Sequence, residues 1–196
     1  LDVLPFGMAH EGAMRLCTWA QHKHPSVTQD MLAHGNNVFV SNFPKAPKAE
    51  GEAIDYSELD AFLAPLAGHD VYLLLHGIPD FGVPMEEEGY VPLLRDFLGK
   101  VFAHLEAQGI PQERVASYPY DEPGINGWPI VEKYVAFARQ ALRAWPTLQF
   151  YVNGSGDLPM LEQLAEVTGL WCPGYYMLSE DTPEMALIRN TGKTLW

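Results

Sequence analysis

Short apolar runs alternate along the chain with segments whose apolar residues repeat at three- and four-residue spacing. The run 70–79 (DVYLLLHGIP) is apolar almost throughout, which is typical of a strand buried on both faces of a parallel sheet. The segment 90–108 instead gathers its apolar residues on one side of a helix. By the same patterns we predict six more strands, at 14–20, 36–43, 113–120, 148–156, 170–177 and 193–196.

A helical segment lies in each of the six gaps between these strands. Besides 90–108, the predicted helices are 26–35, 55–68, 130–145, 159–169 and 182–192. In the first of them we expect Ser26 to be the N-cap and Gly35 to stop the helix. Strand–helix alternation implies right-handed crossovers and a parallel sheet.

We therefore predict a single α/β domain over residues 1–196, with a (β/α)8 TIM-barrel-like fold. The barrel is incomplete, because about seven of the eight β/α units are present. A doubly wound open sheet would need a glycine-rich phosphate loop after the first strand, and 18–26 (TWAQHKHPS) is not one. An open barrel leaves unpaired strand edges, so we expect a partner segment or a dimer to complete it.

The charge of the chain narrows the class of ligand. The 196 residues include 12 Lys and Arg against 25 Asp and Glu, a net charge of -13. This balance argues against nucleic acid and against an anionic membrane surface, and it favours a neutral ligand such as a carbohydrate. No apolar run approaches the roughly 20 residues of a membrane span. Cys17 and Cys172 are predicted to be buried free thiols, with a disulfide as the alternative.

Two adjacent acids, Asp121 and Glu122, directly follow the fourth predicted strand. They are flanked by Tyr118, Tyr120 and Pro123. Catalytic residues of such barrels lie on the loops after the carboxyl ends of the strands. Like charges at this distance disfavour joint ionisation, so one acid can hold a proton while the other stays charged. We interpret the pair as catalytic, and the alternative is a loop with two solvated acids.

The other strand ends supply aromatic rings, amides and a histidine. Rings stack on the apolar faces of sugars, and amides bind hydroxyl groups, so we predict a carbohydrate site. The predicted substrate-binding residues are Trp19, Asn42, His76, Tyr118, Tyr120, Asn153, Tyr175, Tyr176 and Trp196. Trp19 and Trp196 could instead be core residues, His76 a satisfied core histidine, and Asn153 part of a turn with Gly154.

A metal site is not predicted. The HKH stretch at 22–24 imitates the H-x-H of metal-dependent amidohydrolases, but those enzymes need further histidines after the fifth and sixth strands. The last histidine of this chain is His104. We therefore expect no metal and no other cofactor.

The run ASYPYDEPG (116–124), together with the later TLW strand (194–196), resembles the barrel domain of DUF4091-type proteins and of glycoside hydrolase family 123. The resemblance covers most of the chain in element order and rests mainly on the D-E-P stretch. It implies a retaining glycoside hydrolase of N-acetylhexosamine-type glycans, with β-N-acetylgalactosaminides as one candidate. It also implies a secreted or periplasmic protein.

Carried over by position, this resemblance implies a role for each acid. Asp121 would orient and polarise the substrate's 2-acetamido group, which acts as the nucleophile, and Glu122 would be the general acid/base. Either Tyr175 or Tyr176 would donate a hydrogen bond to the acetamido carbonyl.

Two alternatives remain open at the level of sequence. D-E-P also imitates the Asn-Glu-Pro of ordinary retaining glycosidases, in which Glu122 would still be the acid/base and the nucleophile would lie beyond Trp196. The other alternative is a non-catalytic carbohydrate-binding barrel.

Overall fold

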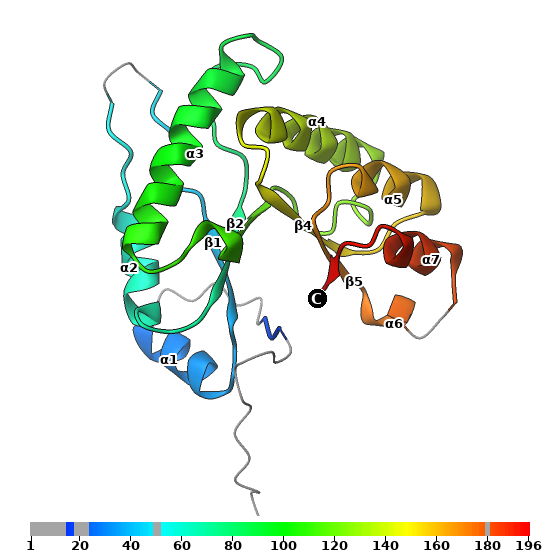
Figure 1. Ribbon diagram of the computed structural model, residues 1–196, viewed down its shortest axis with the longest axis horizontal. Helices are drawn as coiled ribbons and strands as arrows, with labels where there is room; N and C mark the ends of the chain where they lie inside the picture. Colours follow the sequence, from blue (N-terminus) through cyan, green and yellow to red (C-terminus); the bar gives the residue numbers. More distant parts are fainter. Residues whose placement is uncertain (1–14, 18–23, 49–51, 179–180) are drawn as a thin grey trace, which may run out of the picture.

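The computed structural model describes residues 15–17, 24–48, 52–178 and 181–196 (Figure 1). Within them, six strands form one parallel sheet in the order of the sequence. The strands are β1 (Val38–Asn42), β2 (Tyr72–His76), β3 (Val115–Tyr118), β4 (Gln149–Gly154), β5 (Leu170–Pro173) and β6 (Thr194–Leu195). Cys17 forms an isolated parallel bridge with Val38, so the first predicted strand runs beside β1 where it is described. The rest of that predicted strand lies outside the described residues.

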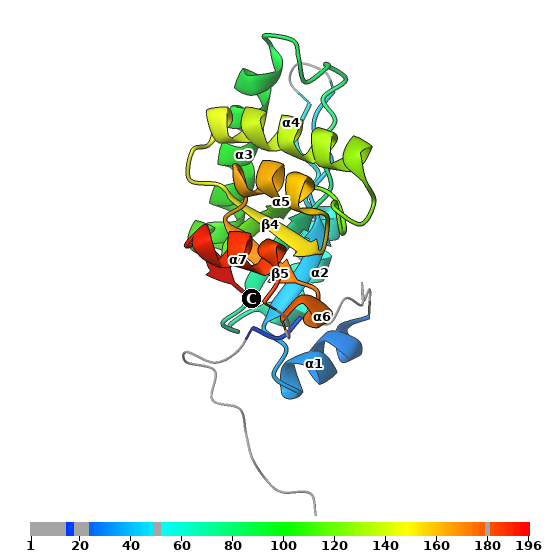
Figure 2. The ribbon, with the colours of Figure 1, turned by 90° about the vertical axis from the view of Figure 1, so that its right-hand side faces the viewer.

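With the exception of α6, the α-helices of the described residues fall in the gaps where helices were predicted. They are α1 (Pro25–Ala33), α2 (Ser57–Leu63), α3 (Tyr90–Ala107), α4 (Trp128–Ala144), α5 (Leu158–Ala165), α6 (Tyr175–Leu178) and α7 (Pro183–Asn190), with 3-10 turns at Ala64–Leu66 and Gln112–Arg114. Figures 1 and 2 show α3, α4, α5 and α7 following one another around the outside of the sheet. The prediction of a barrel-like α/β fold is confirmed.

Among the boundaries that differ from the predicted ones, those of α1 and β5 have a clear physical cause. The N-cap of α1 is His24 and not Ser26, because Pro25 occupies the first turn, where its missing N–H costs nothing. The predicted strand 170–177 ends at Pro173, and residues from Tyr175 onward form α6. After Pro173, the backbone N–H of Gly174 donates to the Gly154 carbonyl at 2.9 Å, which fixes where the chain leaves the sheet.

Both faces of the sheet are buried. Outward-facing strand residues such as Leu73 and Phe150 pack with the helices in one large cluster. Inward-facing residues form a second cluster around Val38, Leu74 and Tyr151, as the interior of a barrel does. This double burial explains why the sequence of β2 is apolar without alternation.

The sheet is open over the described residues. β6 pairs with β5 on one side, and its Leu195 is 45% exposed. Over the residues that the structure describes, the barrel is thus not closed, as predicted. None of the described helices has the length and apolar character needed to cross a membrane.

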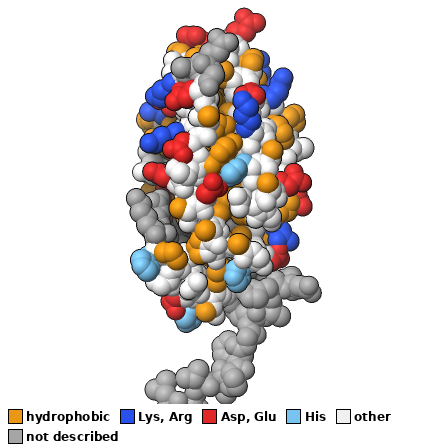
Figure 3. All heavy atoms as spheres, turned by 90° about the vertical axis from the view of Figure 1, so that its left-hand side faces the viewer, with side chains coloured by type: hydrophobic (Ala, Val, Ile, Leu, Met, Phe, Trp, Pro, Cys, Tyr) orange, Lys and Arg blue, Asp and Glu red, His pale blue; other side chains and the backbone are white. Residues whose placement is uncertain are grey.

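Ion pairs and polar contacts join the outer elements. Figure 3 shows the face on the side of α2 and α3, where acidic and basic side chains are scattered among apolar ones. His104 of α3 contacts Asp60 of α2 at 2.5 Å, and within α3 Lys100 contacts Asp96 at 2.7 Å. The Lys100 and Asp96 side chains are both more than half exposed, so this pair contributes little to stability.

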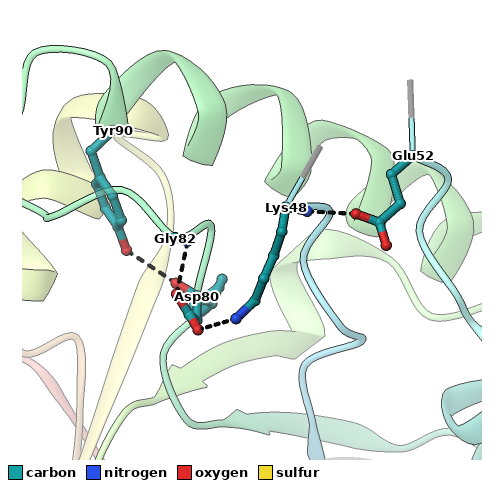
Figure 4. Close-up of polar contacts among 6 residues, drawn as sticks. Lys48, Glu52, Asp80, Gly82 and Tyr90 are labelled. Atoms are coloured by element: carbon teal, nitrogen blue, oxygen red, sulfur yellow. Dashed lines mark hydrogen bonds and ion pairs between the residues drawn. The ribbon is translucent and has the colours of Figure 1, made fainter. Parts of the chain in front are cut away.

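The loops after β1 and β2 are tied together by Lys48 and Asp80 (Figure 4). The ammonium group of Lys48 lies 2.6 Å from the Asp80 carboxylate, which also accepts the Gly82 N–H at 2.8 Å. These hydrogen bonds lower the pKa of Asp80. The Lys48 N–H donates to Glu52 at 2.7 Å and so shapes the first of the two loops.

Substitutions of two leucines on α3 test how this helix packs against the core. Leu98 is fully buried, whereas Leu93 is 41% exposed. We expect Leu98→Ala to lower the free energy of unfolding by about 2–5 kcal/mol, because it removes buried methyl groups and leaves a cavity. Leu93→Ala should change it by less than about 0.5 kcal/mol. Urea unfolding followed by circular dichroism measures both, and equal losses would contradict the described orientation of α3.

Candidate functional site

The carboxyl ends of the central strands bring the acidic pair together with a tyrosine and an amide. Asp121 follows β3 by three residues, and its Oδ1 accepts a hydrogen bond from the Tyr118 hydroxyl. The same oxygen accepts a second hydrogen bond, 2.8 Å long, from Nδ2 of Asn153 near the end of β4. Hydrogen bonds to an ionised carboxylate are among the stronger ones in proteins. These contacts hold the Asp121 carboxyl group at the end of β4.

Glu122 has an unusual backbone conformation. Its φ is +42°, and it is the only non-glycine residue of the described ranges with a positive φ. This left-handed conformation costs a residue with a Cβ about 1–2 kcal/mol. Side-chain amides bind both polar groups of the Glu122 backbone. Oδ1 of Asn153 accepts the Glu122 N–H at 2.9 Å, and Nδ2 of Asn126 donates to the Glu122 carbonyl at 3.1 Å. Strain of this kind is found at functional sites.

Glycines let the loops after β3 and β4 pack against each other. A Cβ added to Gly124 would lie 2.3 Å from the Ser155 carbonyl oxygen, which no side chain could tolerate. A Cβ on Gly154 would lie 3.0 Å from Cγ of Glu122. The Glu122 side chain therefore lies directly over the end of β4. Oδ1 of Asp121 contacts the side chain of Asn153, the residue that precedes Gly154, so both acids lie at the end of β4.

His76 and Tyr118 lie next to each other at the ends of β2 and β3. They are partners in the strand register, and their ring centroids are 5.2 Å apart. Burial lowers the pKa of His76, although Asp121 opposes this, so the imidazole is neutral at pH 7. Burial and the hydrogen bond to Asp121 raise the pKa of Tyr118 far above its usual value. Tyr118 thus stays protonated and remains a donor to Asp121.

The structure describes three more of the predicted residues. Asn42 pairs with His76 in the register and is exposed at the end of β1. Tyr120 is half-buried and packs against the main core. Tyr175 is 86% exposed at the start of α6.

The remaining predicted residues lie elsewhere or are not described. Trp196 packs against Tyr72 and Tyr151 with ring centroids 5.5 and 5.8 Å apart, which places its indole in the inner cluster of the sheet. Trp19 lies outside the described residues, and so does the Tyr176 side chain. Cys17 and Cys172 are free and partly buried.

Sequence reasoning missed two residues of this group. Asn126 was not predicted, although an asparagine shortly after an acidic pair is a common turn residue. Its Nδ2 also donates to the Asp121 carbonyl at 2.9 Å. Gly124 was part of the DEPG stretch, but the close contact it permits could not be read from the sequence.

A cavity of about 280 Å³ lies beside the end of β1, between α1 and α2. Asn42 is among its lining residues, whereas Asp121 and Glu122 are not. Asp121 is exposed and Glu122 half-buried, so the acidic pair lies on an open surface of the described structure. In the described ranges there is no cluster of three or more His, Cys, Asp or Glu residues able to hold a metal ion. His22 of the HKH stretch is not among those ranges.

The arrangement of the strands and helices is similar to that of solved glycoside hydrolases. One is the intracellular xylanase of Thermoanaerobacterium saccharolyticum in complex with xylotetraose, at 11% identity over 88% of this chain and 69% of that chain, with a TM-score of 0.53. The same enzyme in complex with xylotriose gives 12% identity, the same coverage and a TM-score of 0.53. A bacterial orthologue of human α-L-iduronidase shares 17% identity over 81% of this chain and 32% of its own, with a TM-score of 0.46.

No protein-family model and no curated protein sequence matches the chain. At identities this low the similarity to the xylanase concerns the fold alone. The chain has a TIM-barrel-like α/β fold of the kind found in these hydrolases.

Proposed function

We propose that this protein is a glycoside hydrolase in which Glu122 is the general acid/base. One observation carries the proposal: two adjacent carboxylates lie at the carboxyl end of β3, one bound by two donors and the other turned onto the end of β4. The similarity of the fold to a xylanase supports it, because catalytic residues of such barrels lie at this end of the sheet.

The two carboxylates are suited to different roles. The Asp121 carboxyl group accepts hydrogen bonds from Tyr118 and Asn153, which fix its position. Glu122 is held through its backbone and not through its carboxylate, which leaves the carboxyl group available to a substrate. Two adjacent carboxylates disfavour joint ionisation, and the proposed mechanism requires the proton to be on Glu122.

The substrate we infer is an N-acetylhexosaminide, and a β-N-acetylgalactosaminide is one candidate. The acetamido oxygen attacks the anomeric carbon while Glu122 protonates the leaving glycosidic oxygen, which gives a cyclic oxazolinium ion. Asp121 accepts the acetamido N–H and stabilises the positive charge that develops there. Glu122 then takes a proton from water, whose oxygen attacks the anomeric carbon and reopens the ring. This route needs no enzyme carboxylate at the roughly 5 Å separation of ordinary retaining enzymes.

Of the two candidate tyrosines, Tyr175 is the one whose side chain the structure describes. It follows Gly174, whose N–H binds Gly154, and Gly154 contacts the Glu122 side chain. The exposed Tyr175 ring therefore starts beside the acid/base and could donate to the acetamido carbonyl.

A second candidate is an ordinary retaining glycosidase, which the fold of the xylanase favours. Glu122 keeps its role there, and the nucleophile would be a carboxylate beyond Trp196. A carbohydrate-binding barrel without catalysis is the third candidate, and it requires that Glu122 be dispensable.

Replacing the proposed acid tests the function itself. We expect Glu122→Gln to lower kcat/KM for a 4-nitrophenyl N-acetylhexosaminide by about 10²–10⁴-fold, because the leaving oxygen is no longer protonated. A 2,4-dinitrophenyl glycoside should be affected less, since its leaving group needs little protonation. Steady-state kinetics on both substrates measure the difference.

The matched control for this variant is Glu132→Gln on the exposed side of α4, which makes the same chemical change away from the site. It should keep full activity. If Glu122→Gln turned over both glycosides at nearly the rate of the unmodified protein while its circular dichroism was unchanged, Glu122 could not be the acid/base.

The identity of the nucleophile separates the two enzyme candidates. With substrate assistance, a thiazoline that mimics the cyclic intermediate should inhibit strongly, because the site is complementary to that state. Asp121→Asn should slow turnover severely, since it removes the charge that stabilises the acetamido group. A 2-fluoro sugar should leave no adduct detectable by mass spectrometry. A stoichiometric glycosyl adduct without thiazoline inhibition would instead show an ordinary retaining mechanism.

A further inference from the structure

A single side-chain amide connects the two acids of the site. Asn153 donates from Nδ2 to Oδ1 of Asp121 at 2.8 Å and accepts the Glu122 N–H on its own Oδ1 at 2.9 Å. We propose that Asn153 is a positioning residue that holds the Asp121 carboxylate and the Glu122 backbone at the same time, and that it does not bind the sugar. The inference rests on the proposed function and assigns a role within that site.

The orientation of this amide follows from its partners. A backbone N–H can only donate, so the oxygen of Asn153 must face Glu122 and its NH₂ group must face Asp121. An NH₂ group can only donate, so Oδ1 of Asp121 has to be an acceptor. The Tyr118 hydroxyl donates to the same oxygen. Oδ1 of Asp121 is thus occupied by two donors, which leaves Oδ2 for the substrate.

The second hydrogen bond of Asn153 stabilises the backbone conformation of Glu122. The left-handed backbone of Glu122 turns its side chain onto Gly154, and Asn153 binds the N–H of that strained residue. Without this contact, nothing on the N–H side opposes a return to an ordinary backbone conformation. Such a return would move the carboxyl group away from the end of β4.

Burial explains why Asn153 is unsuited to binding a sugar. Asn153 is 8% exposed and belongs to β4, where it pairs with Cys172 of β5. Tyr118 is 2% exposed. Because Asn153 is fixed in the strand ladder, its amide group has a well-defined position. Asp121 and Tyr175, in contrast, are exposed and can reach a ligand.

The variant Asn153→Asp separates the two hydrogen bonds. It keeps the acceptor for the Glu122 N–H, removes the donor to Asp121, and places a third carboxylate beside the pair. We expect kcat to fall about 10²-fold, the usual effect of losing one preorganised donor, while KM stays within about twofold. The acidic limb of the pH–rate profile should move to higher pH, because adjacent carboxylates resist joint ionisation. Asn190→Asp, at the exposed end of α7, makes the same charge change as a control and should move neither.

A measurement that needs no activity follows the other hydrogen bond. In NMR hydrogen exchange, the Glu122 amide should be protected in the unmodified protein and in Asn153→Asp. In Asn153→Ala it should exchange at least about tenfold faster, the factor expected when one hydrogen bond of about 1.4 kcal/mol is lost. If Asn153→Ala does not fold, the pH–rate profile of Asn153→Asp decides alone.

The possible outcomes distinguish a failure of this inference from a failure of the proposed function. If Asn153→Asp raises KM, leaves kcat unchanged and does not move the pH profile, Asn153 binds substrate and the positioning role is wrong. A Glu122 amide that exchanges equally fast in all three proteins would also overturn it. If the exchange pattern holds but no glycoside is hydrolysed by the unmodified protein, the positioning contacts stand and the proposed function fails.

Discussion

The site depends on the hydrogen bonds that join the end of β3 to the end of β4 through the Asn153 side chain. Neighbouring residues in an extended chain point to opposite sides, and two free carboxylates repel each other. The Asn153 amide offers a donor to Asp121 and an acceptor to Glu122, so both acids take defined positions. The parallel sheet makes this possible, because it places the two strand ends side by side.

The surrounding structure makes this contact rigid. Gly124 lets the loop after β3 approach the loop after β4, and the Gly174 N–H pairs with the end of β4 from the other side. Below the acids, Tyr118 and Tyr151 fill the inner cluster of the sheet. A carboxylate held by buried donors needs no reorganisation when a substrate binds, which is the condition for electrostatic stabilisation of a developing charge.

Much of the fold was predictable, because it is encoded in local patterns. The apolar run of β2 and the helical spacing of α3 predicted their elements to within a few residues. The position of Asp121 and Glu122 after a strand followed from order along the chain alone. The left-handed backbone of Glu122 and the role of Asn153 were not predictable, because both depend on contacts between β3 and β4. The α6 helix was missed for a similar reason: residues 170–177 read as one apolar run, and only the structure shows where it leaves the sheet.

The most direct test of the account is the crystal structure of the Glu122→Gln variant with an uncleaved N-acetylhexosaminide. The account predicts the acetamido N–H within hydrogen-bond distance of Oδ2 of Asp121, and the glycosidic oxygen beside the residue at position 122. Tyr118 and Asn153 should keep their contacts with Oδ1. A sugar bound away from the acidic pair, for example in the cavity beside the end of β1, would contradict it. The same holds for an acetamido group that points away from Asp121.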